Sequence, residues 1–72
     1  MAYVYVLWSD KFRKRYIGVS KNVDARLKQH NSSSNRFTRG GIPWVLIYTE
    51  SCKTRTEALK RERFLKSGVG RA

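Results

Sequence analysis

The stretch AYVYVLW, residues 2–8, constrains the fold more strongly than any other part of this sequence. Its residues are mostly β-branched or aromatic, and they would present apolar side chains on both faces of an extended chain. Such a strand is expected where other parts of the protein cover both of its faces. The stretch therefore predicts a central strand.

The segments that follow predict a hairpin and a short helix. Residues 9–14 are polar and suit a hairpin connection, and RYIGVS, residues 15–20, suits the returning strand. Asn22 is a good N-cap for a helix that ends near Asn31, with Val23, Leu27 and His30 on one face.

The second half of the chain predicts one more strand and one more helix. The Ser-, Asn- and Gly-rich residues 32–43 indicate a loop, and WVLIYT, residues 44–49, indicates a third buried strand. Thr54 and Glu57 match a capping box at the start of a helix that runs to about Lys66, where Gly68 would end it. The predicted fold is α+β: a three-stranded antiparallel sheet with two flanking helices, in the order β-β-α-β-α. It would form one domain over residues 1–72, with a core at about 2–67 and a short tail at 68–72.

The charge of the chain indicates a polyanionic partner. Sixteen Lys and Arg residues oppose five Asp and Glu residues, which gives a formal net charge of +11 spread along the whole sequence. This pattern is typical of proteins that bind nucleic acid, although a basic protein of another kind, such as a ribosome-associated one, has the same composition.

Cysteine use and hydropathy bear on the compartment. Cys52 is the only cysteine, so the chain forms neither an internal disulfide framework nor a cysteine-rich zinc site, which fits a reducing cytoplasm. No apolar run approaches the ~20 residues that a membrane-spanning helix needs.

Glu62 is the one carboxylate without an ordinary structural explanation at the level of sequence. On a helical wheel it lies between Ala58 and Leu59, within the apolar arc that should face the sheet. A carboxylate there needs a partner. Two readings stay open: an ion pair with Lys66 or Arg55, or a ligand for Mg²⁺, which accepts one or two protein carboxylates and keeps several waters.

A second group of polar side chains lies in the first half of the chain. Arg26 and His30 are four residues apart and share one side of their helix, where they either form a solvated face or act on a phosphate group. Tyr5 and Tyr16 can meet on adjacent strands, as core residues or as catalytic phenols. Gly18 within a strand indicates a bulge or the close approach of another group.

These residues, taken in order, resemble the GIY-YIG nuclease superfamily. The resemblance is to the small stand-alone bacterial members and, more loosely, to the nuclease module of the structure-specific endonuclease that processes branched DNA. The matching elements are Tyr3-Val4-Tyr5, Tyr16-Ile17-Gly18 after ten intervening residues, Arg26, the Gln29-His30-Asn31 segment, and Ala58-Leu59-Lys60-Arg61-Glu62 with Lys66.

The resemblance implies a role for each matching residue. Tyr5 and Tyr16 would form a tyrosine pair, one member of which deprotonates the attacking water, and His30 would assist the base or orient the water. Arg26 would stabilise the transition-state phosphate, and Glu62 would hold one Mg²⁺ or Mn²⁺ ion. Gly18 and Asn31 would belong to the motifs as structural residues.

The sequence departs from the family pattern at two places. Tyr3 and Val4 stand where the name-giving glycine and isoleucine would be, so only Tyr5 of the first motif is retained. Val19 stands where some members have a lysine, so that lysine's role would pass to His30 or be unfilled.

The resemblance implies a divalent-metal-dependent endonuclease that hydrolyses DNA with low sequence specificity, in DNA repair or recombination, with branched and single-stranded DNA as candidate substrates. The alternative is a nucleic-acid-binding module with little or no activity of its own, acting through a partner. Phe37 or Trp44 could stack on bases. Further cations would contact phosphates: Arg36, Arg39, Lys53, Arg55, Lys60 and Lys66.

Overall fold

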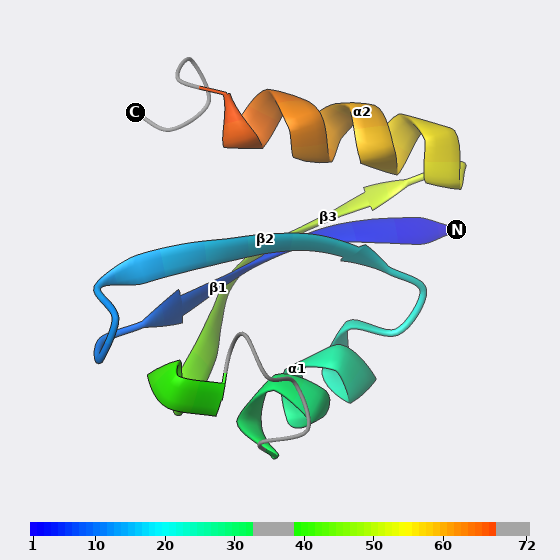
Figure 1. Ribbon diagram of the computed structural model, residues 1–72. Helices are drawn as coiled ribbons and strands as arrows, with labels where there is room; N and C mark the ends of the chain where they lie inside the picture. The colour runs from blue at the N-terminus through cyan, green and yellow to red at the C-terminus, as the bar shows by residue number, and fades with distance from the viewer. Residues whose placement is uncertain (33–38, 68–72) are drawn as a thin grey trace.

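The fold is a three-layered α+β arrangement around a small sheet. The computed structural model describes residues 1–32 and 39–67, and Figure 1 shows the sheet lying between two helices. Strands β1 (Ala2–Ser9), β2 (Lys14–Ser20) and β3 (Trp44–Cys52) form an antiparallel sheet in the order β2-β1-β3. Helix α2 (Arg55–Lys66) covers one face, and helix α1 (Val23–Asn31) lies on the other. The predicted fold class and element order are confirmed.

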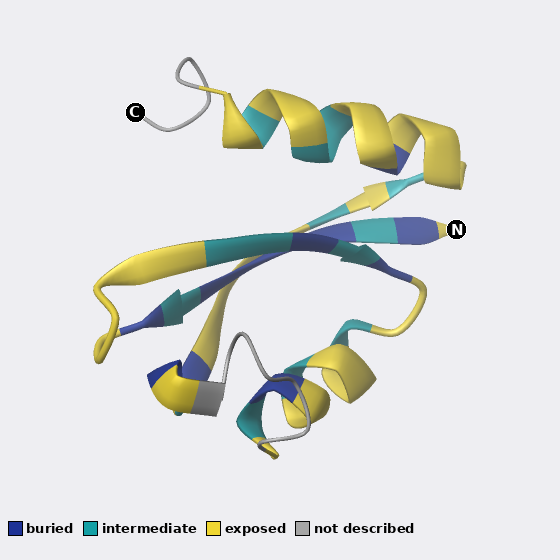
Figure 2. Cartoon of the chain, in the orientation of Figure 1, coloured by how far each residue is buried: buried dark blue, intermediate teal, exposed yellow. Residues whose placement is uncertain are grey.

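The central position of β1 explains its composition. It pairs with β2 on one side and β3 on the other, and nearly all of its residues are buried, as its dark colour in Figure 2 shows. Because successive side chains point to opposite faces, β1 supplies both halves of the core. Val4 packs with Ala58 of α2 on one face, and Tyr5 and Leu7 pack with residues of α1 on the other.

The third strand corrects one expectation. Residues 44–49 were expected to form a buried strand, but β3 is an edge strand whose apolar residues after Trp44 are exposed, as Figure 2 shows. Val45, Ile47 and Tyr48 are between 44% and 52% exposed. An edge strand has only one neighbour, so its burial depends on strand order, which hydropathy alone does not specify.

Both helix starts follow the sequence pattern. The Asn22 side chain accepts a hydrogen bond from the Ala25 N–H at 3.1 Å, and the Thr54 hydroxyl accepts one from the Glu57 N–H at 3.2 Å. The Glu57 carboxylate accepts from the Lys53 N–H at 3.3 Å, one residue earlier than an ideal capping box requires.

The connections differ from expectation in detail. Within the predicted loop, a 3₁₀ turn, η1 (Arg39–Gly41), precedes the cis Ile42–Pro43 bond. Helix α2 ends at Lys66, where the Ser67 N–H donates to the carbonyl oxygens of Arg63 and Phe64. Gly68, the expected terminator, lies outside the described residues, as do Arg36 and Phe37.

Neither α1 nor α2, the helices in the described part of the chain, combines the length and the apolar character that crossing a bilayer requires.

Candidate active site

Three ring side chains from three elements form the centre of the candidate site. Tyr5 comes from β1, Tyr16 from β2 and His30 from the last turn of α1. The ring centroids of Tyr16 and His30 lie 4.6 Å apart, and those of Tyr5 and Tyr16 lie 6.4 Å apart. The Tyr5 hydroxyl is 3.4 Å from His30 Nε2, within hydrogen-bond reach. The two tyrosines therefore meet across the hairpin, on the α1 side of the sheet.

Gly18 makes room for Tyr5. The two residues are direct partners in the β1–β2 register, and a Cβ atom at position 18 would lie 2.5 Å from the Tyr5 hydroxyl oxygen and 2.6 Å from its Cζ. The Tyr5 side chain thus lies across the backbone of β2 at the one place where β2 has no side chain. Of the two readings of Gly18, close approach is the right one, since the irregularity in the sheet occurs between Val6 and Leu7, opposite β3.

Burial controls the protonation of Tyr5 and His30. Tyr5 is 2% exposed, and desolvation, with a smaller contribution from Tyr16, raises its pKa to about 12. His30 is equally buried, and desolvation followed by the positive charge of Arg26 lowers its pKa below the ordinary value of 6.5. At neutral pH, Tyr5 keeps its proton and His30 is uncharged.

Arg26 and Glu62 act on the same tyrosine from opposite sides of the sheet. Arg26 is exposed on α1, one turn before His30, and its charge lowers the pKa of Tyr5. Glu62 is on α2, and its charge raises the pKa of Tyr5. Helices α1 and α2 cover different faces of the sheet (Figure 1), and the Tyr5 side chain lies across β2 at Gly18, between these two faces.

Glu62 lies at the boundary of the packed face of α2 rather than deep within it. Its side chain is 21% exposed, and Leu59, expected to border the apolar arc, is 43% exposed. Ala58 is the residue of α2 that is completely buried. The ion pair that the sequence left open exists, with Lys66 Nζ 3.3 Å from a carboxylate oxygen of Glu62.

This ion pair leaves Glu62 accessible to a metal. Lys66 is 56% exposed, and exposed pairs spaced i,i+4 stabilise a helix by only about 0.3–0.5 kcal/mol. No group of three or more His, Cys, Asp or Glu side chains suited to a metal ion occurs among the described residues. A single half-buried carboxylate fits Mg²⁺, because Mg²⁺ completes its shell with waters and substrate phosphate oxygens.

Asn31 has a clear structural task. Its side-chain amide donates to the Trp44 carbonyl oxygen at 2.9 Å, and its side-chain oxygen accepts from the Trp44 N–H at 2.6 Å. The end of α1 is thereby fastened to the start of β3, and His30 is held against the sheet.

Trp44 is part of this packing, which corrects its expected availability for base stacking. It is 4% exposed, and its ring meets that of Tyr16 edge-on at a centroid distance of 6.2 Å. The predicted burial of the strand that begins at Trp44 holds for this residue, whereas the apolar residues Val45–Tyr48 that follow it are exposed.

Three other predicted cations with described side chains, Lys53, Arg55 and Lys60, lie on or beside α2. Lys53 and Lys60 line a shallow hollow between β3 and α2 that also contains Glu50 and Glu57. Arg55 is exposed at the first turn of α2. Arg39 begins η1, and its side chain is outside the described part of the structure.

The whole arrangement combines a buried phenol, a second phenol that is partly exposed, an uncharged imidazole, a guanidinium and a carboxylate. A guanidinium binds phosphate oxygens, and a carboxylate binds a hard cation. This set of groups suits phosphodiester hydrolysis, in which negative charge develops around phosphorus.

Comparison with known proteins agrees with this description. The family model of the GIY-YIG catalytic domain matches residues 1–71, and the chain belongs to that family. This is a family of nucleases, which generally use divalent metal ions. The solution NMR structure of a UPF0213 protein from Bacillus halodurans has a TM-score of 0.54 and 34% sequence identity, covering 92% of this chain and 71% of that one.

Curated relatives bear names that specify no function. A UPF0213 protein of Clostridium perfringens is 37% identical over 67 residues, which cover 92% of this chain and 71% of the relative. A UPF0213 protein of Desulfotalea psychrophila is 43% identical over 53 residues, 71% of this chain. The match spans about half (48%) of the length of that relative.

Proposed function

We propose that the protein is a Mg²⁺-dependent endonuclease that hydrolyses DNA phosphodiester bonds with low sequence specificity. The observation that carries this proposal is the packing of Tyr5, Tyr16 and His30, from three different elements, into one cluster beside the helix that carries Arg26. The net charge of +11 supports a polyanionic substrate. A cytoplasmic role in DNA repair or recombination, on branched or single-stranded DNA, extends the proposal.

Tyr16 is the better candidate for the base. Tyr5 is buried and its pKa is raised to about 12. It therefore stays protonated at neutral pH and cannot accept a proton from water. Tyr16 is only partly buried and can meet solvent. Tyr5 and His30 then act as the packed support that fixes the Tyr16 ring.

The proposed step balances as a hydrolysis. The water oxygen forms a bond to phosphorus while the bond from phosphorus to the leaving sugar oxygen breaks. The water proton passes to the oxygen of Tyr16, which acts as the phenolate, and the leaving sugar oxygen takes a proton from solvent. Arg26 donates hydrogen bonds to the non-bridging phosphate oxygens. A divalent cation held by Glu62 would offset the charge that develops on the leaving oxygen.

A direct test is the cleavage of supercoiled plasmid, single-stranded and branched DNA by the purified protein, in Mg²⁺, Mn²⁺ or EDTA. We expect nicking in either metal and none in EDTA. Tyr16→Phe should reduce the cleavage rate by roughly 10²–10⁴, because it removes the acceptor of the proton. Tyr5→Phe, the matched control in the same cluster, should have a much smaller effect.

One observation favours the alternative of a binding module without activity. Glu62 is paired with Lys66, and a carboxylate used only for an ion pair needs no metal. Binding of DNA with no cleavage of any of these substrates in either metal would establish this alternative.

A further inference from the structure

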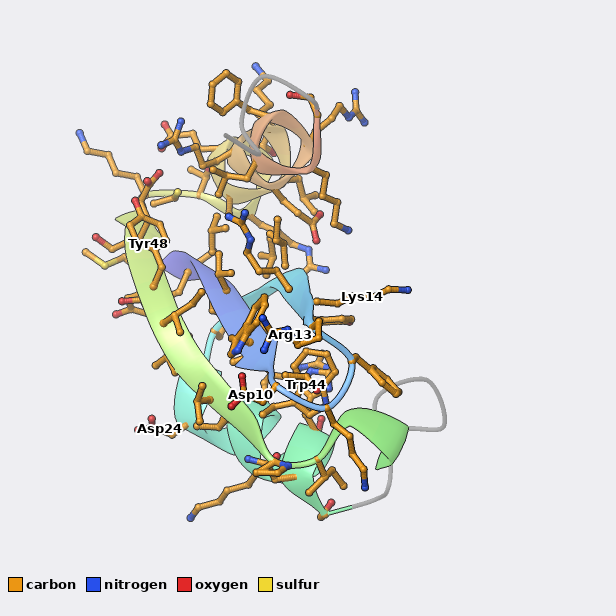
Figure 3. All side chains as sticks on the ribbon, turned by 90° about the vertical axis from the view of Figure 1, so that its left-hand side faces the viewer. Asp10, Arg13, Lys14, Asp24, Trp44 and Tyr48 are labelled. Atoms are coloured by element: carbon orange, nitrogen blue, oxygen red, sulfur yellow. The ribbon has the colours of Figure 1, made fainter. Side chains whose placement is uncertain are left out.

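A basic groove lies at the end of the molecule where β1 turns into β2. Its walls are the end of the β1–β2 hairpin and the last turn of α2, and its volume is about 640 Å³. Figure 3 looks onto this end of the molecule, with the hairpin turn between α2 above and α1 below. The described residues that line the groove are Val6, Trp8, Arg13, Lys14, Arg15, Tyr16, Ile17, Leu65 and Lys66.

The charged residues that line this groove are all positive. Arg13, Lys14, Arg15 and Lys66 are cationic, and no acidic residue is among the described residues that line the groove. Two carboxylates that contact lining residues are Asp10, which accepts a hydrogen bond from Trp8 Nε1 at 2.9 Å, and Glu62, which pairs with Lys66. A concave surface lined by cations concentrates positive potential and attracts a polyanion.

The groove adjoins the candidate active site. Tyr16 lines the groove and belongs to the ring cluster, and Lys66 lines the groove and contacts Glu62. A strand whose scissile phosphate lies near Tyr16 and Glu62 can therefore continue into the groove.

Arg13 has a backbone conformation that is unfavourable for arginine. Its φ is +56°, in the left-handed region where glycine is the preferred residue and other residues are strained. The Arg13 N–H closes the turn by donating to the Ser9 carbonyl oxygen at 2.8 Å. The guanidinium carbon lies 6.0 Å from the centre of the Trp8 ring, which the hydrogen bond to Asp10 holds in place. A turn selected for stability alone would have glycine at this position.

We propose that this groove binds the phosphodiester backbone of the DNA strand next to the cleavage site, with Arg13, Lys14, Arg15 and Lys66 as the phosphate contacts. Lys14 extends from the ribbon into solvent, where a backbone can reach it (Figure 3). The positive φ of Arg13 accords with a role of its side chain in binding, in addition to its contact with the Trp8 ring. The inference rests on the proposed function in taking DNA as the substrate.

The test measures binding and stability, both independently of cleavage. Fluorescence anisotropy with labelled single-stranded and duplex oligonucleotides, in EDTA, gives the dependence of affinity on salt. Each lost phosphate contact should reduce the slope of log K against log salt by about 0.9 for duplex and 0.7 for single strands. Arg13→Gly and Lys14→Ala should each show this reduction with whichever DNA, single-stranded or duplex, binds in the groove. Lys11→Ala is the control, because it removes one charge from the same turn but does not line the groove.

Arg13→Gly provides a second readout, since its stability is measured separately from its binding. Glycine adopts a positive φ without strain, which offsets the loss of the Trp8 contact and the added chain entropy, so the variant should stay folded at urea concentrations close to those of the wild type while binding more weakly. The inference is overturned if the Arg13→Gly and Lys14→Ala slopes match that of Lys11→Ala, or if Arg13→Gly binds like the wild type. If the variants change the salt slope but the wild-type protein does not nick DNA, only the nuclease proposal is refuted. If the wild-type protein nicks DNA but the variants leave the salt slope unchanged, only the proposal for the groove is refuted.

Discussion

Gly18 and Tyr5 are coupled because the tyrosine ring occupies the space that a side chain at position 18 would need. The sequence indicated either a bulge at Gly18 or the close approach of another group, and it could not name that group, because its identity depends on the β1–β2 register. The local sequence pattern indicates where a strand begins, whereas the register depends on both of the strands that pair.

Gly18→Ala should therefore be destabilising through overpacking. A methyl group 2.5 Å from the Tyr5 hydroxyl must displace a ring that is 2% exposed, and we expect a loss of about 1–3 kcal/mol in the free energy of unfolding, measured with urea. In a Tyr5→Val background the same substitution should cost much less, because the clashing ring is gone. Equal costs in the two backgrounds would contradict the packing that we describe.

His30 should make the free energy of unfolding decrease as the pH falls. Its pKa is lowered in the folded protein, so the unfolded chain takes up a proton first as the pH falls through about 6.5, and the folded state loses stability there. The free energy of unfolding should thus be largest above pH 6.5 and decrease between pH 7 and pH 5.

His30→Gln serves as the control for this effect. His30 is the only histidine in the sequence, so removing it should flatten the decrease in that range. A decrease of the same steepness in both proteins would show that His30 is not desolvated as described.

At the scale of elements, the two helix starts and the three strands followed from local sequence. Capping side chains and runs of β-branched residues act within a few positions, so they can be recognised without the tertiary structure. The exposure of β3 did not follow, since it depends on which strand takes the centre of the sheet. The groove was missed for a similar reason: Arg13, Lys14 and Arg15 look like ordinary turn charges until the fold places Lys66 beside them.

The connection between α1 and β3 depends on one side chain. Asn31→Ala removes two hydrogen bonds to the Trp44 backbone, each worth about 0.5–1.5 kcal/mol, and should lower the free energy of unfolding by roughly 1–3 kcal/mol. Lys28→Ala, on an exposed position of the same helix, should change it by less than about 0.5 kcal/mol. Indistinguishable urea unfolding curves for the two variants would remove Asn31 from its proposed structural role.

At the scale of the whole molecule, the layered fold lets residues on both faces of the sheet act at one site. Arg26 and His30 come from the helix on one face and Glu62 from the helix on the other, and Tyr5 lies across β2 between them. Sequence spacing could align each residue with a family motif, but only the three-dimensional structure shows that Tyr5, Tyr16 and His30 pack into one cluster. The basic groove continues from this site toward the hairpin.

The proposed function depends on Glu62 as the residue that supports metal-dependent cleavage. This role can be tested by comparing nicking of supercoiled plasmid in Mg²⁺ by the wild type, Glu62→Gln and Glu57→Gln, with DNA binding in EDTA measured in parallel. Glu57 is the control because it lies on the same helix and its side chain caps the backbone. We predict that Glu62→Gln loses at least about 10²-fold in nicking rate while binding DNA as well as or better than the wild type, and that Glu57→Gln keeps its activity. A Glu62→Gln protein that nicks plasmid at the wild-type rate, or a wild-type protein that binds DNA and does not nick it, would contradict the claim.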